Sequence, residues 1–143
     1  MSDFRQVSNN DYSKPLPLVT HLNKPFWDGT RRHVLLVQIC KLCSTHFFPP
    51  STICIECGSR EIEWVETKGR GIVYTFTIIH QDLNRGFGKE VPYVLALIEL
   101  DEGFRIYSIL TNDPEEVSIG ARASVIFEDV TPEISLYKFK VDS

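Results

Sequence analysis

Alternation of apolar and polar residues dominates the second half of the chain and predicts β-strands. Residues 61–66 read Glu-Ile-Glu-Trp-Val-Glu, which is the period-two pattern of a strand with one buried face. Five further runs rich in β-branched and aromatic residues predict strands at 72–80, 91–100, 104–110, 121–127 and 135–139. Asp101-Glu102-Gly103 is typical of a hairpin turn.

Five short antiparallel strands within residues 68–143 are typical of a small closed barrel of the OB type. Closing the sheet removes unpaired strand edges, which otherwise favour aggregation. We therefore expect a mainly β fold that contains a five-stranded OB barrel. The long connection 81–90 lacks periodicity and holds Phe87 between two glycines. Long connections are often functional, but an ordinary solvated loop explains this one equally well.

The chain before the strands predicts a loosely ordered tail over 1–21 and one short helix. Asn23 is a candidate N-cap, and Gly29 is a typical residue at a helix end. The helix carries Phe26 and Trp27, and such a bulky pair must pack against something. Packing on the protein itself and packing on a partner chain both remain open.

The four cysteines form two CxxC pairs, Cys40 with Cys43 and Cys54 with Cys57, separated by ten residues. Each short turn directs two sulfurs to one point, and a hairpin brings the two turns together. Four thiolates at about 2.3 Å make a closed tetrahedral zinc site, which is structural because no position is left for water. We therefore predict a structural zinc bound by all four. His46 lies between the pairs and is expected at the surface rather than as a ligand.

Three other uses of the cysteines compete with zinc. Two disulfides would need an oxidising compartment, but residues 1–7 lack the apolar run of a signal peptide, which predicts a reducing, cytoplasmic location. Rubredoxin-type iron uses the same paired turns and stays open. A redox dithiol would need one CxxC at a helix start after a strand, not two facing pairs.

Composition narrows the class of partner. The chain is 43% hydrophobic and 24% charged, as expected of a folded domain, and no apolar run approaches the roughly 18 residues of a membrane span. Residues 1–64 hold seven Lys/Arg and six Asp/Glu, whereas 65–143 hold eight and thirteen, a net charge of −5. Nucleic-acid binders normally present a basic face, so this charge argues against general nucleic-acid binding.

The sequence contains no recognisable catalytic set. We find no Ser/His/Asp arrangement, no phosphate-binding Gly-rich loop before a helix, and no close pair of carboxylates in an apolar setting. With four cysteines on a metal, no thiol nucleophile is left. His80 has no positioned partner and is expected to be structural rather than a general acid or base. We do not predict catalysis by the isolated chain.

A longer series of residues, taken in order, matches a known family. The series is Phe26-Trp27, Gln38-x-Cys40-x-x-Cys43, Phe48-Pro49-Pro50, Cys54-x-x-Cys57-Gly58, Trp64, Gly69-x-Gly71, Tyr74-x-Phe76-Thr77, Pro92-Tyr93, Leu100-Asp101-Glu102-Gly103 and Ile119-Gly120. The chain resembles the OB-fold, rubredoxin-like zinc-ribbon proteins associated with acyl-CoA enzymes, a family long known as a domain of unknown function. The resemblance covers about residues 22–140. It departs at Ser44, where the usual knuckle glycine is absent.

The resemblance implies a helix and rubredoxin-like zinc ribbon over 22–67, followed by an OB-fold domain over 68–143. It also implies an accessory subunit in a hetero-oligomer with a thiolase, a lipid-transfer-protein-like aldolase, or a thiolase–synthase assembly that forms hydroxymethylglutaryl-CoA. In such complexes the ribbon and helix dock on the catalytic subunit, and the barrel helps to enclose the acyl-CoA. An aromatic acyl-CoA thiolase, such as benzoylsuccinyl-CoA thiolase, is one candidate.

Contact with coenzyme A would require cations for its nucleotide end and an apolar slot for its pantetheine arm. The candidate cations lie at the ribbon–barrel joint and in the long connection, and they are Lys68, Arg70, Arg85 and Lys89. The candidate aromatic residues are Phe76, Phe87 and Tyr93. Solvated cations and core aromatics are the alternative for each residue.

Two other functions belong to different classes. OB folds and zinc ribbons both occur in nucleic-acid-binding modules, and this is the main alternative. The charge of the barrel half speaks against it, since a strand-binding barrel is normally basic. A stand-alone hydrolase or thioesterase would need the catalytic set that the sequence lacks.

Overall fold

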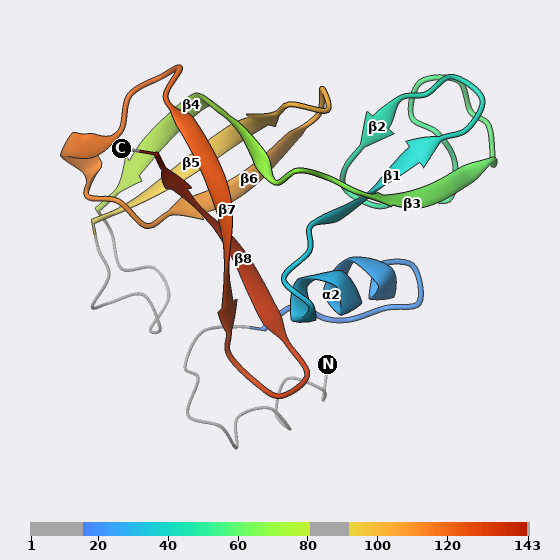
Figure 1. Cartoon of the computed structure of the whole chain (residues 1–143), viewed down its shortest axis with the longest axis horizontal. Coiled ribbons are helices and arrows are strands. Elements are labelled where there is room, and N and C mark those ends of the chain that lie inside the picture. The colour runs from blue at the N-terminus through green and yellow to red at the C-terminus, as the bar shows by residue number, and fades with distance from the viewer. Residues whose placement is uncertain (1–15, 81–91, 143) are drawn as a thin grey trace.

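A computed structural model describes residues 16–80 and 92–142 as a small ribbon, one helix and a barrel (Figure 1). Helix α2 spans Lys24–Arg31 and precedes the ribbon strands β1 (Leu36–Cys40), β2 (His46–Phe47) and β3 (Ile62–Glu66). The barrel strands are β4 (Arg70–Ile79), β5 (Tyr93–Leu100), β6 (Arg105–Leu110), β7 (Arg122–Asp129) and β8 (Ser135–Val141). A single 3₁₀ turn, η3 (Pro114–Glu116), lies between β6 and β7.

The ribbon is a three-stranded antiparallel sheet with the order β2-β1-β3. Its central strand pairs residue by residue with β3, from Leu36 opposite Glu66 to Cys40 opposite Ile62. The loops that connect β1 to β2 and β2 to β3 carry the remaining cysteines. The ribbon therefore consists of little more than the two cysteine turns and the strands that support them.

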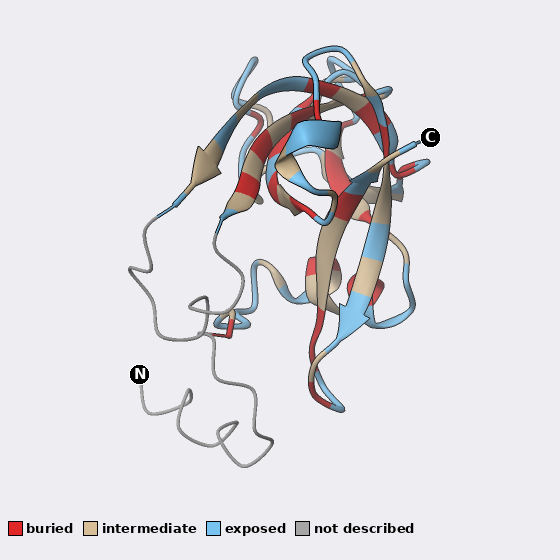
Figure 2. Ribbon diagram, turned by 90° about the vertical axis from the view of Figure 1, so that its left-hand side faces the viewer, coloured by how far each residue is buried: buried red, intermediate tan, exposed pale blue. Residues whose placement is uncertain are grey.

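The barrel closes in the order β4-β5-β6-β8-β7, in which only β6 and β8 run parallel. This is the OB topology, and it confirms the expected fold class. β5 shows why these residues form strands, since every second residue, from Val94 to Leu100, is buried in the barrel and the residues between them are half-buried. Figure 2 shows the buried positions gathered inside the curved sheet.

Helix α2 joins the ribbon to the barrel. Phe26 is 2% exposed and packs in the same core as buried residues of β4, β5 and β6. Its ring lies 5.2 Å from that of Phe48 in the ribbon and 5.5 Å from that of Tyr137 in β8. Figure 1 shows the helix between the ribbon and the far end of the β7–β8 hairpin. The aromatic pair on the helix thus packs on this protein's own ribbon and barrel.

Two details of the predicted helix are wrong. The helix continues past Gly29 and ends at Arg31. Gly29 allows a close approach of Leu36, since a Cβ at residue 29 would lie 2.9 Å from the Cγ of Leu36. Asn23 occupies the N-cap position without capping the helix, and its side chain accepts the backbone N–H of Thr20 at 2.6 Å.

A close backbone approach fixes the joint between ribbon and barrel. A Cβ on Gly71 would lie 2.2 Å from the carbonyl oxygen of Glu99 in the neighbouring strand, so no larger residue fits there. Gly69 has φ +69°, which L residues with a side chain rarely adopt. Both glycines of this predicted joint are therefore required by geometry.

Among the described residues, no helix is long and apolar enough to cross a bilayer.

Candidate functional site

The two CxxC turns face each other at the free end of the ribbon and have the same local geometry. In the first turn, the backbone N–H of Ser44 donates to the carbonyl of Cys40 at 2.8 Å. In the second, the N–H of Gly58 donates to the carbonyl of Cys54 at 3.0 Å. In each turn a backbone N–H also points at the first sulfur, from Cys43 to Cys40 Sγ at 3.5 Å and from Glu56 to Cys54 Sγ at 3.3 Å.

The four sulfurs come together at one point. All four Sγ atoms lie within 4.8 Å of one another, and the Cys40–Cys57 and Cys43–Cys54 pairs are each separated by 3.6 Å. Tetrahedral zinc with bonds of about 2.3 Å requires sulfur separations of about 3.8 Å, which agrees with this arrangement. A disulfide would need about 2.05 Å, and the four cysteines are free. They are positioned to bind a metal.

The electrostatics of the sulfur cluster also fit a bound cation. Hydrogen bonds from the side chain and the backbone of Thr45 lower the pKa of Cys43 to about 6. At Cys57 the backbone of Ser59 favours the thiolate, but desolvation and the three other sulfurs raise the pKa to about 12. Four thiolates this close repel one another, and a divalent ion supplies the missing positive charge.

One side of the cluster is buried and the other side reaches the surface. Cys40 and Cys54 are 0% and 2% exposed, whereas Cys43 and Cys57 are exposed. Beside them, Leu42 and Ile55 are 73% and 64% exposed, one from each turn. Each cysteine turn of the candidate metal centre therefore exposes an aliphatic side chain.

Ser44 adopts the conformation of the glycine that it replaces. Its φ of 64° is close to the 77° of Gly58 at the equivalent position of the second turn. A non-glycine residue in this region is disfavoured by roughly 1–2 kcal/mol. The sequence departure at Ser44 therefore leaves the shape of the turn unchanged. His46 is half-buried in β2, with its ring 6.5 Å from that of Phe104, and is not part of the sulfur group.

Two of the four cations predicted to contact coenzyme A, Lys68 and Arg70, lie at the joint, and one of them is already paired. Arg70 donates to Asp142 at 2.8 Å. The exposed Lys68 donates its backbone N–H to Glu102, and its side chain has no ion pair in the described part of the chain. Arg85, Phe87 and Lys89 lie outside the described residues.

The predicted aromatic residues lie nearer the other end of the same strands. Phe76 is half-buried against the barrel core, and Tyr93 begins β5 opposite Ile79. Six residues of strand separate Arg70 from Phe76, which is about 20 Å. Lys68 and Arg70 lie two residues apart at the joint. Phe76 lies opposite the buried Ala96, whereas Tyr93 lies opposite Ile79, three residues further along β4, so the two aromatic residues lie on opposite faces of the sheet. The structure therefore does not bring the predicted cations and aromatic residues into one site. His80 follows β4 and is exposed.

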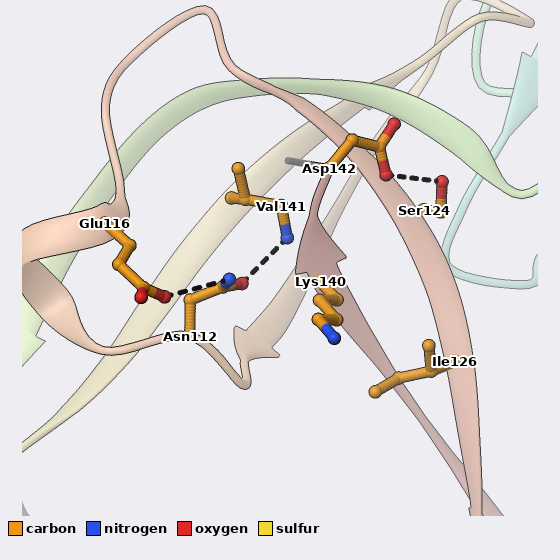
Figure 3. Close-up of a pocket in the computed structure, with 7 residues that line it drawn as sticks. All are labelled: Asn112, Glu116, Ser124, Ile126, Lys140, Val141 and Asp142. Atoms are coloured by element: carbon orange, nitrogen blue, oxygen red, sulfur yellow. Dashed lines mark hydrogen bonds between the residues drawn. The ribbon is translucent and has the colours of Figure 1, made fainter.

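A depression of about 780 Å³ lies against β7 and β8 (Figure 3), and one of its lining residues, Asp142, binds Arg70 of the joint. Its polar groups already bind one another, since Asn112 donates to Glu116 and accepts the N–H of Val141, while Ser124 donates to Asp142. Only Lys140 of its charged residues lacks a described partner. We find no catalytic arrangement among these lining residues.

A Ser, an Asp and a His do meet elsewhere, in an order that does not activate the serine. The carboxylate of Asp129 lies between the other two, contacting His33 Nε2 at 2.9 Å and accepting the hydroxyl of Ser135. A nucleophilic serine needs the histidine as its direct neighbour. This group instead ties the segment after α2 to the β7–β8 hairpin.

The exposed tyrosines of the barrel were missed by the sequence analysis, although alternation around Tyr107 already indicates an outward side chain.

Two family profiles match the chain, and they meet within β3. Residues 27–63 match "ChsH2, rubredoxin-like zinc ribbon domain", and residues 64–128 match "ChsH2, C-terminal OB-fold domain". Among solved structures, the chain is similar to "Ltp2-ChsH2(DUF35) aldolase", with a TM-score of 0.78 and 31% identity over 88% of this chain and 98% of the other.

Several curated proteins are similar over most of the chain. A DUF35 domain-containing scaffold protein of Methanocaldococcus jannaschii is 37% identical over 76% of this chain and 81% of its own length. The benzoylsuccinyl-CoA thiolase subunit BbsA of Geobacter metallireducens is 33% identical, over 71% and 70%. A probable enoyl-CoA hydratase alpha subunit of Thermomonospora curvata is 32% identical over 89% of this chain, which spans only 40% of that relative.

Proposed function

Because the chain belongs to the family of ChsH2-type zinc-ribbon and OB-fold proteins, we propose that it is a non-catalytic accessory subunit of a thiolase-type acyl-CoA enzyme. In this proposal the helix and ribbon (22–67) dock on the catalytic subunit, and the barrel (68–143) helps to enclose the acyl-CoA. Relatives whose names identify them as a thiolase subunit, a hydratase subunit and a scaffold support the assignment. An aromatic acyl-CoA thiolase, a hydroxymethylglutaryl-CoA-forming complex and an aldolase are the candidate assemblies, in the cytoplasm.

One observation carries the docking role: the exposed aliphatic residues of the cysteine turns. Leu42 precedes Cys43, and Ile53 and Ile55 flank Cys54 in the sequence, and each of the three is at least 40% exposed. Burying a leucine or isoleucine side chain contributes about 1.5–3 kcal/mol. A partner that covers this surface would gain that free energy and would also close the open side of the metal centre.

In this proposal Cys40, Cys43, Cys54 and Cys57 hold a zinc ion, whose chemistry here is structural. Four thiolates leave no coordination position for a substrate. The two buried sulfurs fix the ion to the ribbon interior, and the backbone N–H groups of the turns stabilise the thiolates. The ion thereby keeps Leu42 and Ile55 at fixed positions on the docking surface.

Catalysis is assigned to the partner, because the described residues offer no activated nucleophile. Asp129 separates Ser135 from His33, and the cysteines are committed to the metal cluster. The joint cations Lys68 and Arg70, together with Phe76 and Tyr93, remain candidates for acyl-CoA contact once a partner is in place. The same holds for Arg85, Phe87 and Lys89.

The test is assembly with the catalytic subunit. Affinity-tagged chain purified from its native cell should bring down a thiolase-type subunit, and acyl-CoA turnover should require both proteins. The double variant Leu42→Ser/Ile55→Ser should lose the partner while retaining its metal. Ile126→Ser, which changes an exposed aliphatic residue of the barrel, is the matched control and should retain the partner. Acyl-CoA turnover by the isolated chain, or an unaffected double variant, would contradict the proposal.

A further inference from the structure

The side chain of Tyr74 points away from the barrel interior because β4 contains a β-bulge. The register of β4 against β5 shifts between Val73 and Thr75, and Tyr74 is the extra residue. Val73 is fully buried in the barrel, whereas Tyr74 is 43% exposed and Thr75 is also exposed. Bulges commonly redirect a side chain next to a functional site. The bulge here places an aromatic ring on the outer face of the barrel.

Arg105 covers one side of that ring from two strands away. Its guanidinium carbon lies 3.7 Å from the centre of the Tyr74 ring, so Arg105 of β6 reaches across β5 to β4. Glu99 of β5, opposite Arg105 in the ladder, is 4.0 Å from the guanidinium. The Arg105 side chain is 46% exposed. A planar guanidinium stacked on tyrosine leaves its other surface open to a further planar group.

Tyr107 adds a second ring to the same outer face. It lies two residues from Arg105 on β6 and is 65% exposed. Its backbone carbonyl accepts the hydroxyl of Tyr137 at 3.0 Å. Desolvation raises the pKa of Tyr137 to about 12, so this hydroxyl stays protonated and continues to donate. The strand that carries Tyr107 is thereby held to β8.

We propose that Tyr74, Arg105 and Tyr107 form a stacking platform that binds the adenine nucleotide end of an acyl-CoA. The platform lies on the outer face of the first three barrel strands, with Tyr74 on β4 and Arg105 and Tyr107 on β6. This region overlaps the face of the second and third strands that OB folds use for ligands. Tyrosine and arginine bind nucleobases by stacking, whatever the base. This inference rests on the proposed function and names its ligand contact. The platform shares no residue with the joint cations or with the Phe76 group.

Charge favours a single nucleotide over a nucleic-acid strand as the source of the base. A strand-binding barrel needs a basic groove along the backbone. Here residues 65–143 carry eight Lys/Arg and thirteen Asp/Glu, and Glu99 lies beside the platform. A carboxylate accepts from an amino group such as that of adenine and repels a phosphate backbone.

The test measures binding of coenzyme A, adenosine 3′,5′-bisphosphate, pantetheine and a twelve-nucleotide oligodeoxyadenylate to the full chain and to its assembled complex. Tyr74→Leu and Tyr107→Leu should each weaken coenzyme A and bisphosphate binding about tenfold, the effect of losing one stacked base. Tyr107→Phe keeps the ring and should bind within twofold of wild type. Pantetheine has no base, so its binding should not change. Ile126→Ala is the distant control.

Four results would overturn the platform. Unchanged nucleotide affinity in the leucine variants, or no nucleotide binding by chain and complex alike, removes it. If the oligodeoxyadenylate binds more tightly than coenzyme A, the ligand of the platform is nucleic acid rather than an acyl-CoA. Loss of the catalytic subunit from Tyr107→Leu makes this face a docking surface instead. Failure of the platform with an intact complex leaves the proposed function standing, whereas failure of assembly removes the proposed function itself.

Discussion

The ribbon and the barrel differ in what fills their interiors. The ribbon's own cluster consists of Cys40, Phe47 and Cys54, with Ile62 packed against it, so two of its three buried residues are candidate metal ligands. The barrel has a continuous core of aliphatic and aromatic residues from β4 to β8, which Val37 of β1 also joins. The comparison teaches that one unit depends on a metal for its interior and the other depends on packed side chains.

Their surfaces differ in a matching way. The large apolar residues that the ribbon exposes are the aliphatic Leu42, Ile53 and Ile55. The barrel exposes Ile119 and Ile126 and also Tyr74 and Tyr107, which are the tyrosines exposed among the described residues. Aliphatic surface fits a partner protein, and exposed aromatic rings fit a planar ligand. The exposed tyrosines of the barrel are the part of this difference that supports the division of labour proposed for the two units.

Loss of the metal should have the largest effect and should be confined to the ribbon. Structural zinc contributes roughly 10–16 kcal/mol to folding in zinc-finger peptides. Chelation, or Cys54→Ser, should abolish amide hydrogen-exchange protection in β2 and the cysteine turns while β5 and β6 stay protected. Ile55→Ser, in the same turn but not a ligand, should behave as wild type. Equal loss of protection in both units would contradict the predicted difference between ribbon and barrel. A metal analysis that finds one iron per chain would show that the bound metal is iron instead of zinc.

Phe26→Ala should affect both units together, because this side chain lies in the core that helix α2 shares with the barrel. Truncating a fully buried phenylalanine costs about 3–5 kcal/mol. Urea unfolding should show this loss with coincident transitions for ribbon and barrel probes. Leu22→Ala, 38% exposed just before the helix, is the control and should change stability by less than about 0.5 kcal/mol. A normal barrel transition in Phe26→Ala would show that the two units are independent.

The two cysteine turns give a smaller, paired prediction. Gly58→Ala meets no atom within 4 Å, so its only cost is the positive φ, roughly 1–2 kcal/mol. Ser44→Gly relieves the same strain in the first turn and should stabilise the metal-bound ribbon, by about 1 kcal/mol or less. Urea unfolding of the zinc-loaded variants measures both. Opposite signs are expected, and a stabilising Gly58→Ala would contradict the argument from φ.

The smallest expected effect is a pH dependence of the tie between the segment after α2 and the barrel hairpin. The Ser135 hydroxyl, and then His33, lower the pKa of Asp129. A depressed carboxyl pKa stabilises the fold above its unfolded value of about 3.9, and this contribution is lost as pH falls through the folded value. The stability difference between wild type and Asp129→Asn should therefore persist down to about pH 5 and shrink below pH 4. Glu133→Gln, which removes a neighbouring exposed carboxylate, should show no such trend.

Strands were predictable from the sequence because each one alternates locally. The expected runs match β4 to β8 within two residues. The cysteine cluster was predictable because spacing alone brings the sulfurs of each turn together. The metal that they bind in the protein stays a prediction, as does the division of the chain at residues 67 and 68.

The features that the sequence analysis missed depend on contacts between segments that are distant in the sequence. Gly29 reads as a helix end, but its role is to let Leu36 approach the helix. The bulge at Tyr74 depends on how β4 pairs with β5, and the position of Arg105 above it depends on a strand between them. No local pattern contains this information, so the platform could not be found from the sequence.

The contact between Phe26 and Tyr137 has a consequence for how the protein is made. Helix α2 is synthesised before any barrel strand, and β8 is the last strand of the barrel. Until β8 emerges, Phe26 lacks the Tyr137 ring that covers it, and the barrel cannot close. Newly synthesised chains therefore carry an uncovered aromatic surface while β1 to β7 are being made, and the emergence of β8 is the step at which ribbon and barrel become one body.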